Sequence, residues 1–400
     1  MVPTQPINVT TIKAHPVKAR AALLGLLAAA FAALALASVW DSAEDPVVWT
    51  PDALYYQARL LEIRGVDHDA ALERTFDGPL SAELRARDPN HTGNAAWVEY
   101  NEPFYERRVA FPLAGAALYD VAGNRSLLYL SLAGYVAAIL ALFAFLLLRF
   151  RVAIASLITL GAVFLPPLVH HSSYPLTDSW GLALLIVALT AAVLALDRGL
   201  RWLPLWIGAL LILGFTRDST WIPVLAAGWC AVRYRSRVPV TLFATGLAAA
   251  LPPLLLYQVP VRELLAELVN GLEPSRDTSW PFILGHYPGA LLDLVRANVG
   301  FLRRGEWYTA LYLVGGVVSL LLVAWRRPVT RTPTTALMTA GSVAALLYVF
   351  AAPAFSAFRL ELVFLPMAAW GLALATEVVA ARLAERQGTL ARLPAASRRS

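Results

Sequence analysis

Long apolar segments alternate with short polar ones along the chain, and their lengths predict helices that cross a membrane. A helix needs about 20 apolar residues to cross the hydrocarbon core of a bilayer. Windows of roughly this length are apolar at residues 20–40, 124–149, 152–170, 178–196, 203–216, 219–233, 239–257, 307–325, 333–353 and 359–381. The pattern therefore predicts an all-α membrane protein with about ten transmembrane helices.

Two longer polar regions, residues 41–123 and 258–306, interrupt the predicted bundle. Within the first, residues 104–123 are apolar, but this segment is short and a stronger apolar run follows it directly. We expect an interfacial helix here, because a crossing at this place would reverse the side of every later loop. The expected organisation is a tail at 1–19, a transmembrane domain at 20–381 and a basic tail at 382–400.

Basic residues predict the orientation of the helices. They gather at alternate ends of the apolar segments, as Lys13, Lys18 and Arg20; Arg149 and Arg151; Arg198 and Arg201; Arg233, Arg235 and Arg237; Arg326, Arg327 and Arg331; and Arg382, Arg386 and Arg392. Cytoplasmic loops of membrane proteins carry an excess of Lys and Arg. We therefore expect both termini in the cytoplasm, and the regions 41–123 and 258–306 outside it.

The composition agrees with this reading. Hydrophobic residues make up 58% of the 400 positions and charged residues 15%, against about 25% charged in a soluble domain. The formal net charge of +6 comes from clusters that act as orientation signals, so we predict no nucleic-acid site. The single cysteine, Cys230, excludes a disulfide within the chain and a cysteine-based metal cluster.

Asp52 is the first candidate functional residue. Thr50 is a predicted N-cap, Pro51 takes the first helical position, and Asp52 falls in the first turn. Its interaction with the helix dipole, worth about 0.3–1 kcal/mol, is one complete explanation of the acid. The other makes Asp52 a general base at the membrane surface, with Tyr56 and Arg59 one and two turns further along.

For other polar residues of the predicted outer face, a functional role and a purely structural explanation are both open. His170, His171 and Asp178 would suit a metal ion only in an extended loop, because adjacent helical residues diverge by about 100°. Interfacial solvation is the alternative, so no cofactor is required and a divalent metal is left open. Arg217 beside Asp218 is also explained as a neutralising pair at a tight turn. Snorkelling of the side chain likewise explains Arg359.

One acid, several arginines and a membrane groove suffice for one reaction, transfer of a sugar from a lipid-linked phosphate to a hydroxyl. The carboxylate accepts the proton of the hydroxyl, and cationic groups stabilise the charge on the departing phosphate. A transporter or scramblase for lipid-linked saccharides is the alternative. It would place ionisable residues at mid-span depth, where this sequence has almost none. A third class, an O-antigen ligase or polymerase, would also use an outer loop with arginines.

Five stretches in order resemble the GT-C superfamily of membrane glycosyltransferases. They are PDALYYQARLLEIRG, YERRVAFPLAGAALYDVAG, SSYPLTDSWGLALLIVALTAA, LGFTRDSTWIPVLAA and FRLELVFLPMAAWG. The resemblance implies a GT-C-like fold and a polyprenyl- or dolichyl-phosphate sugar as donor. It also implies that Asp52 is the catalytic acid of the first loop. The first loop of this superfamily often carries paired acids, whereas Asp52 stands alone, which leaves Asp45 and Asp41 as rival bases. We also expect no large C-terminal soluble domain.

We therefore expect an inverting, mannosyltransferase-like enzyme of the cell envelope, in a bacterial plasma membrane, with its active site outside the cytoplasm. Its partners would be a polyprenyl-phosphate-linked sugar, the lipid bilayer and a glycan, lipid or protein acceptor. Asp52 or Asp45 would be catalytic. The expected substrate-binding residues are Tyr56, Arg108, His171, Asp178, Arg217, Arg303, Arg304 and Arg359.

Overall fold

The computed structural model describes residues 14–41, 47–87, 89, 92–257, 260–271, 273–304, 306–326, 332–353, 356 and 358–391. The described residues form helices, turns and loops, and no strand is found among them. Seven helical segments are long and apolar enough to cross a membrane, namely Ala19–Ser38, Ala110–Leu147, Asp178–Arg198, Arg237–Leu256, Trp307–Trp325, Pro333–Ala351 and Glu361–Leu383. The chain is therefore an all-α, multi-pass membrane protein, as its apolar pattern predicts.

The other predicted spans differ from expectation. The segment 152–170 consists of two helices, α9 (Val152–Val163) and α10 (Pro166–Ser172), bent by 58° with respect to each other. Together they would make an eighth span. The segments 203–216 and 219–233 form α12 (Leu203–Gly214) and α13 (Trp221–Tyr234), of 12 and 14 residues. Such helices are about 18 and 21 Å long, shorter than the core of about 30 Å. The count of about ten is therefore not confirmed.

The helix α7 (Ala110–Ala122) covers the apolar segment that precedes the strong run of α8 (Ser126–Leu147). Although the two helices follow each other closely, a side chain added at Gly115 would overlap Leu127 of α8 and Leu60. Twelve residues along a straight helix would separate Gly115 from Leu127 by about 18 Å. The chain therefore folds back at Gly123, whose positive φ of 54° suits glycine. The helix α7 is thus a separate helix packed on α8, and its place in the membrane interface stays a prediction.

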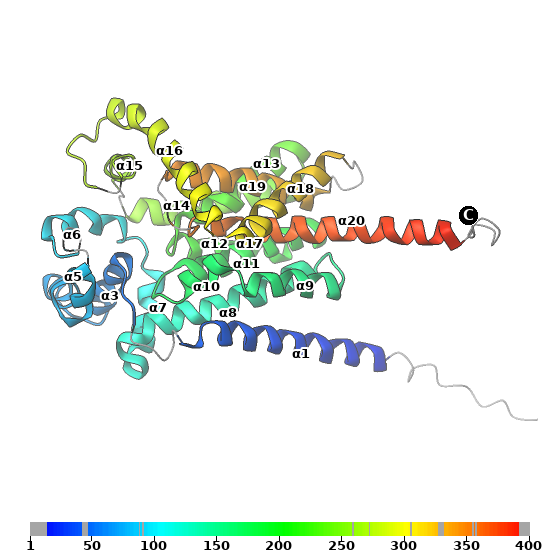
Figure 1. Ribbon diagram of the computed structural model, residues 1–400, viewed down its shortest axis with the longest axis horizontal. Helices are drawn as coiled ribbons and strands as arrows, with labels where there is room; N and C mark the ends of the chain where they lie inside the picture. The colour runs from blue at the N-terminus through cyan, green and yellow to red at the C-terminus, as the bar shows by residue number, and fades with distance from the viewer. Residues whose placement is uncertain are drawn as a thin grey trace, which may run out of the picture.

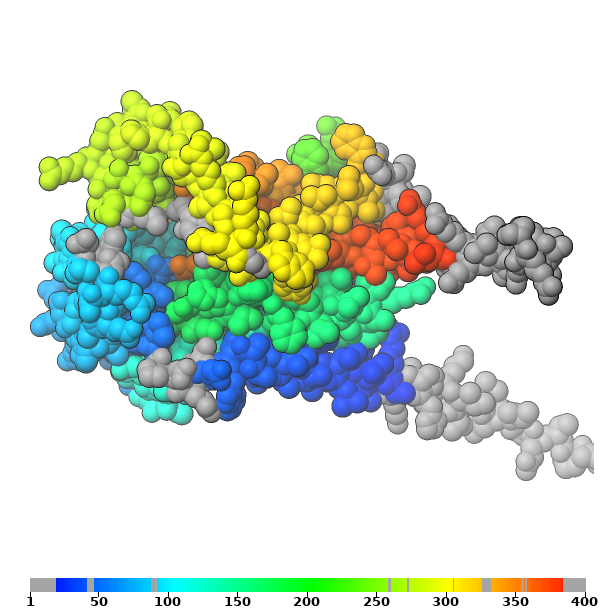
Figure 2. Space-filling model, viewed as in Figure 1, coloured from blue at the N-terminus to red at the C-terminus, as the bar shows by residue number. Residues whose placement is uncertain are grey.

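The remaining membrane helices pack closely. Their bounds are Ala14–Ser38 for α1, Asp178–Arg198 for α11, Arg237–Leu256 for α14, Trp307–Thr309 for α17, Gly315–Arg326 for α18, Pro333–Ala351 for α19 and Leu365–Ala391 for α20, with a π-helical turn at Ala310–Val314. The helix α11 packs against both α8 and α12, and α18 packs against α20. Figure 2 shows α1 along one edge of the bundle, where it contacts α8.

The two polar regions form helices of 5 to 24 residues. These are α3 (Pro51–Ile63), α4 (His68–Leu72), α5 (Ala82–Arg87), α6 (Ala95–Asn101), α15 (Val261–Val269) and α16 (Trp280–Arg303), with a π-helical turn at Glu73–Asp77. The helices of the first region belong to a second apolar cluster, which includes Tyr55, Leu60 and Phe76 together with Leu127 and Leu130 of α8. Figure 1 shows both regions at one end of the bundle, opposite the start of α1 and the end of α20. The two polar regions and the two chain ends thus lie at opposite ends of the bundle, and which end faces the cytoplasm stays a prediction.

Candidate active site

The first turn of α3 holds Asp52 at the boundary between the first-loop helices and the membrane bundle. Thr50 is the N-cap, and its Oγ1 accepts a hydrogen bond from the backbone N of Ala53 at 3.3 Å. Pro51 takes the first helical position. Both assignments confirm what the sequence predicts locally. The cap fixes the start of the helix and therefore the direction in which the Asp52 side chain leaves it.

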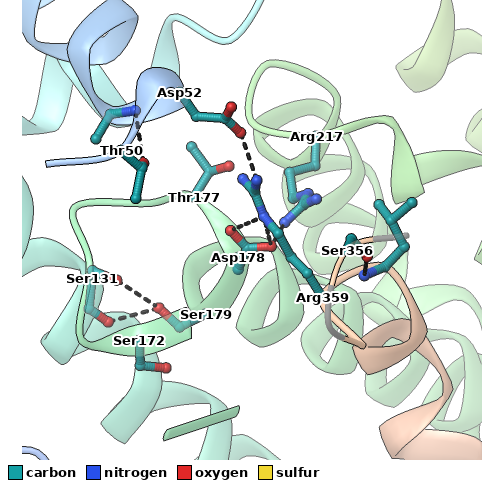
Figure 3. Close-up of polar contacts among 12 residues, drawn as sticks. Thr50, Asp52, Ser131, Ser172, Thr177, Asp178, Ser179, Arg217, Ser356 and Arg359 are labelled. Carbon is teal, nitrogen blue, oxygen red and sulfur yellow. Dashed lines mark hydrogen bonds and ion pairs between the residues drawn. The ribbon is translucent and has the colours of Figure 1, made fainter. Parts of the chain in front are cut away.

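Arg359 connects Asp52 to the bundle (Figure 3). Its Nη1 lies 2.6 Å from Oδ2 of Asp52, and its Nε donates to both carboxylate oxygens of Asp178 at 2.9 Å. Arg217 forms a further ion pair with Oδ1 of Asp178. The four side chains come from α3, the start of α11, the turn between α12 and α13, and the segment before α20. One continuous ionic network therefore joins the first polar region to three parts of the bundle.

A second group of charges lies beside this network. The Nη1 of Arg108 donates to the hydroxyl of Tyr56 at 2.9 Å, and that hydroxyl lies 3.3 Å from Oγ1 of Thr177. Arg107 forms an ion pair with Asp218, whose other carboxylate oxygen is 3.7 Å from Nη2 of Arg108. The Nε of Arg108 is buried and has no hydrogen-bond partner among the described residues.

The surroundings of Asp52 favour its ionised form. Burial alone would raise the pKa of Asp52, but the charge of Arg359, the hydrogen bond from Tyr105 at 2.7 Å and the charge of Arg108 together lower it below 3.8. Burial would lower the pKa of Arg359, yet the charges of Asp178 and Asp52 hold it well above its ordinary value. Asp52 and Arg359 are therefore ionised at neutral pH.

The network opens into a cavity of about 510 Å³. Asp52 and Arg359 line it, with side chains 22% and 19% exposed, whereas the side chain of Asp178 is only 2% exposed and lies beneath them. The ionic groups of the network and its neighbours are those of Arg107, Arg108, Arg217 and Arg359 and of Asp52, Asp178 and Asp218, with a net formal charge of +1. Such a concave site, with buried guanidinium groups and a small excess of positive charge, suits a phosphate-bearing ligand.

Most of the residues predicted for the site come together. Asp52, Arg108, His171, Arg217 and Arg359 line the cavity. Tyr56 and Asp178 lie directly behind it, bonded to Arg108 and Arg359 respectively.

Other candidates lie elsewhere. Arg303 and Arg304, at the end of α16, are exposed and do not line the cavity, and Asp41 is likewise exposed outside it. Asp45 lies outside the described residues. Arg59 bonds to Glu62 instead.

The histidines expected to be candidate metal ligands do not form a triad with Asp178. The rings of His170 and His171 stack edge to face at 5.1 Å, and two arginines occupy the Asp178 carboxylate. Within the described residues, one group of three side chains has its ligand atoms close enough for a metal ion, and it consists of Glu62, His68 and Glu102 in the first polar region.

Sequence reasoning missed Tyr105, which donates to Asp52 and stacks on the ring of Tyr55 with centroids 4.4 Å apart. Its only local signal is its position three residues before Arg108. Stacking and hydrogen bonding with α3 depend on how the chain returns from α6, which no periodicity reveals.

The fold and the site define a polytopic, helical membrane protein with an arginine-rich cavity at one end of its bundle. Comparisons of the chain with protein-family models, with curated proteins and with solved structures find no match.

Proposed function

We propose that this protein is an inverting glycosyltransferase that moves a sugar from a polyprenyl phosphate to an acceptor hydroxyl, with Asp52 as the general base. One observation carries the proposal. The carboxylate of Asp52 faces the same cavity as the guanidinium groups of Arg108, Arg217 and Arg359, at the end of a bundle of membrane helices. A base and a phosphate site are thus within one cavity, beside helices between which a lipid tail can lie.

The reaction needs few groups. The acceptor oxygen attacks the anomeric carbon of the sugar, the bond from that carbon to the phosphate oxygen breaks, and the hydroxyl proton passes to Asp52. The leaving polyprenyl phosphate gains one negative charge, which the arginines stabilise more strongly than they stabilise the donor. Because the leaving phosphate is a weak base, it needs no proton. Attack from the face opposite the phosphate inverts the anomeric configuration.

The ion pair of Asp52 with Arg359 has a mechanistic consequence. A carboxylate whose pKa lies below 3.8 is a weak base, and a base works best when its pKa is near the operating pH. A bound phosphate would compete for Arg359 and draw the guanidinium away from Asp52. The pKa of Asp52 would then rise when the donor binds, so that the base becomes stronger once the sugar is in place.

The location proposed with this function is a bacterial plasma membrane, with the cavity on the extracytoplasmic side. Both polar regions lie at the end of the bundle opposite the start of α1 and the end of α20 (Figure 1). The basic clusters favour a cytoplasmic position for those ends. The acceptor would be a hydroxyl of a glycan, lipid or protein outside the cytoplasm.

The test is a transfer assay with purified protein, polyprenyl-phosphate sugars and a panel of hydroxyl acceptors. Asp52→Asn should abolish transfer while donor binding is retained or tightened, because a competing anion has been removed from Arg359. Asp120→Asn is the matched control, since Asp120 is an exposed carboxylate that also pairs with an arginine, Arg64, at 2.5 Å. Full transfer by Asp52→Asn would remove Asp52 from the role. Flux of the lipid across liposomes that lack any acceptor would favour a transporter instead.

A further inference from the structure

A second cavity, of about 110 Å³, lies along α3 toward the C-terminal end of that helix. Tyr55, Ala58, Arg59 and Glu62 line it, at the spacing that places residues on one face of a helix. The opposite wall includes His68, from the start of α4, and Glu102 and Glu106, from the segment that follows α6. The cavity therefore brings an imidazole and several carboxylates together from three separate segments.

Three of these side chains converge closely. Oε1 of Glu62 lies 2.7 Å from Nδ1 of His68, and Nε2 of His68 lies 3.4 Å from Oε1 of Glu102. One ligand atom from each residue falls within 4.8 Å of the other two. Ligand atoms around a metal ion with bonds of about 2.0–2.2 Å are roughly 3–3.5 Å apart. The two carboxylates contact different ring nitrogens of His68, Glu62 at Nδ1 and Glu102 at Nε2, so one carboxylate would turn toward the nitrogen that binds the ion.

We propose that Glu62, His68 and Glu102 bind a divalent transition-metal ion, Zn²⁺ or Mn²⁺. The mixed ligand set indicates this class, because imidazole favours zinc and its neighbours in the first transition row whereas carboxylates also suit Mn²⁺. Mg²⁺ and Ca²⁺ prefer sites made of oxygen atoms alone. This site is separate from the cavity at Asp52, and the proposal does not depend on the glycosyltransferase function.

The charges around the triad suit a dication. Glu62, Glu102 and Glu106 face a single guanidinium, that of Arg59, which bonds to Oε2 of Glu62 and leaves Oε1 to the histidine. A metal ion would neutralise this excess of negative charge. Arg59 would then be an outer partner that orients a ligating carboxylate.

The ion would position residues of the candidate active site without touching the reacting groups. Glu62 lies ten residues after Asp52 on α3, which corresponds to about 15 Å along the helix axis. Glu102 precedes Tyr105 by three residues, and Tyr105 donates to Asp52. A metal ion that clamps Glu102 to α3 would therefore restrict the motion of Tyr105 relative to Asp52.

The experiment measures metal content and affinity in the full chain, purified in detergent with an affinity tag that contains no histidine. After removal of metals with a chelator, the protein is dialysed against Zn²⁺ or Mn²⁺ alone. We expect one equivalent of ion to be retained, and His68→Gln to weaken binding by more than about tenfold, the lower bound for loss of an outer partner. Glu83→Gln is the control, since that side chain is 84% exposed in the same polar region. It should leave affinity unchanged.

X-ray absorption on the metal-loaded native chain needs no variant, so it remains decisive if His68→Gln fails to fold. We expect oxygen ligands together with the outer-shell scattering of one imidazole. Retention of substoichiometric metal, a spectrum without imidazole, or equal affinity in the native chain and a folded His68→Gln variant would each overturn the proposal. Loss of transfer activity alone would not bear on it, so a failure of the proposed enzymatic function can be recognised separately.

Discussion

The substitution Asp178→Asn removes the charge on which two arginines converge. The side chain of Asp178 is 2% exposed and that of Arg217 is 10% exposed, so Arg217 would keep a buried positive charge without its partner. Loss of one member of a buried ion pair costs about 3–5 kcal/mol. Arg359 would keep its ion pair with Asp52 at 2.6 Å, and its side chain is 19% exposed, so the loss of its ion pair with Asp178 costs less. We therefore expect a decrease in the free energy of unfolding of about 3 kcal/mol, at the lower end of that range.

The assay is unfolding by SDS in mixed micelles, followed by far-ultraviolet circular dichroism. Asp197→Asn is the matched control, because Asp197 lies on the same helix, α11, is exposed, and as asparagine keeps the Oδ1 atom that accepts the hydrogen bond from Thr334. Asp197→Asn should change the free energy of unfolding by no more than about 0.5 kcal/mol. Adding Arg217→Met to Asp178→Asn removes the unpaired charge, and this pair should show a coupling of about 0.5–3 kcal/mol. If the free energy of unfolding of Asp178→Asn is within about 0.5 kcal/mol of that of the native chain, the ionic network does not stabilise the fold.

Three further predictions concern the site and the bundle. Because the pKa of Asp52 is lowered, its ion pair stabilises the fold above pH 3.8, and this stabilisation is lost as the pH falls through the lowered pKa. The difference in unfolding free energy between the native chain and Asp52→Asn should therefore shrink in acid. If the pairing is absent, acid should leave this difference unchanged. Tyr105→Phe removes a hydrogen bond that lowers the pKa of Asp52, so the acid limb of the pH profile of kcat/KM for transfer should move to higher pH, whereas an unaltered profile would exclude a role for the hydroxyl. Gly371→Ala would place a methyl group against a backbone carbonyl of α18 and should destabilise the protein by about 1–3 kcal/mol in the same SDS assay. The control Gly208→Ala places its methyl group in open space and should leave stability unchanged. Equal effects of the two substitutions would refute the close packing of α18 on α20.

Local sequence was sufficient wherever neighbouring residues decide the structure. The N-cap at Thr50 and the helix start at Pro51 follow from the chemistry of three consecutive residues, and the structure confirms both. The helical, multi-pass character follows from the length of the apolar runs. The number of spans was less accessible, because the pattern does not reveal the 58° bend before Pro166 or the shortness of α12 and α13.

The candidate site also combines features that the sequence predicts with features that depend on tertiary structure. Sequence order suggested Asp52, Asp178, Arg217 and Arg359 separately, but it also suggested Arg303, which lies outside the cavity. An exposed arginine at a helix end and one directed into a cavity have the same local signature, since both follow an apolar run. The difference arises from the direction in which the helix end faces.

The sequence by itself determined that this chain forms membrane helices and that about half of its acids lie between the first two of them. Only the tertiary structure decided which charges meet. Asp52 and Arg359 are 307 residues apart and become partners because α3 lies over the end of the bundle, where the segment before α20 also ends. No short-range pattern encodes such a contact, because it depends on how whole helices pack. When the helices are packed, the two side chains lie in a partly desolvated cavity, where their electrostatic attraction is stronger than in water.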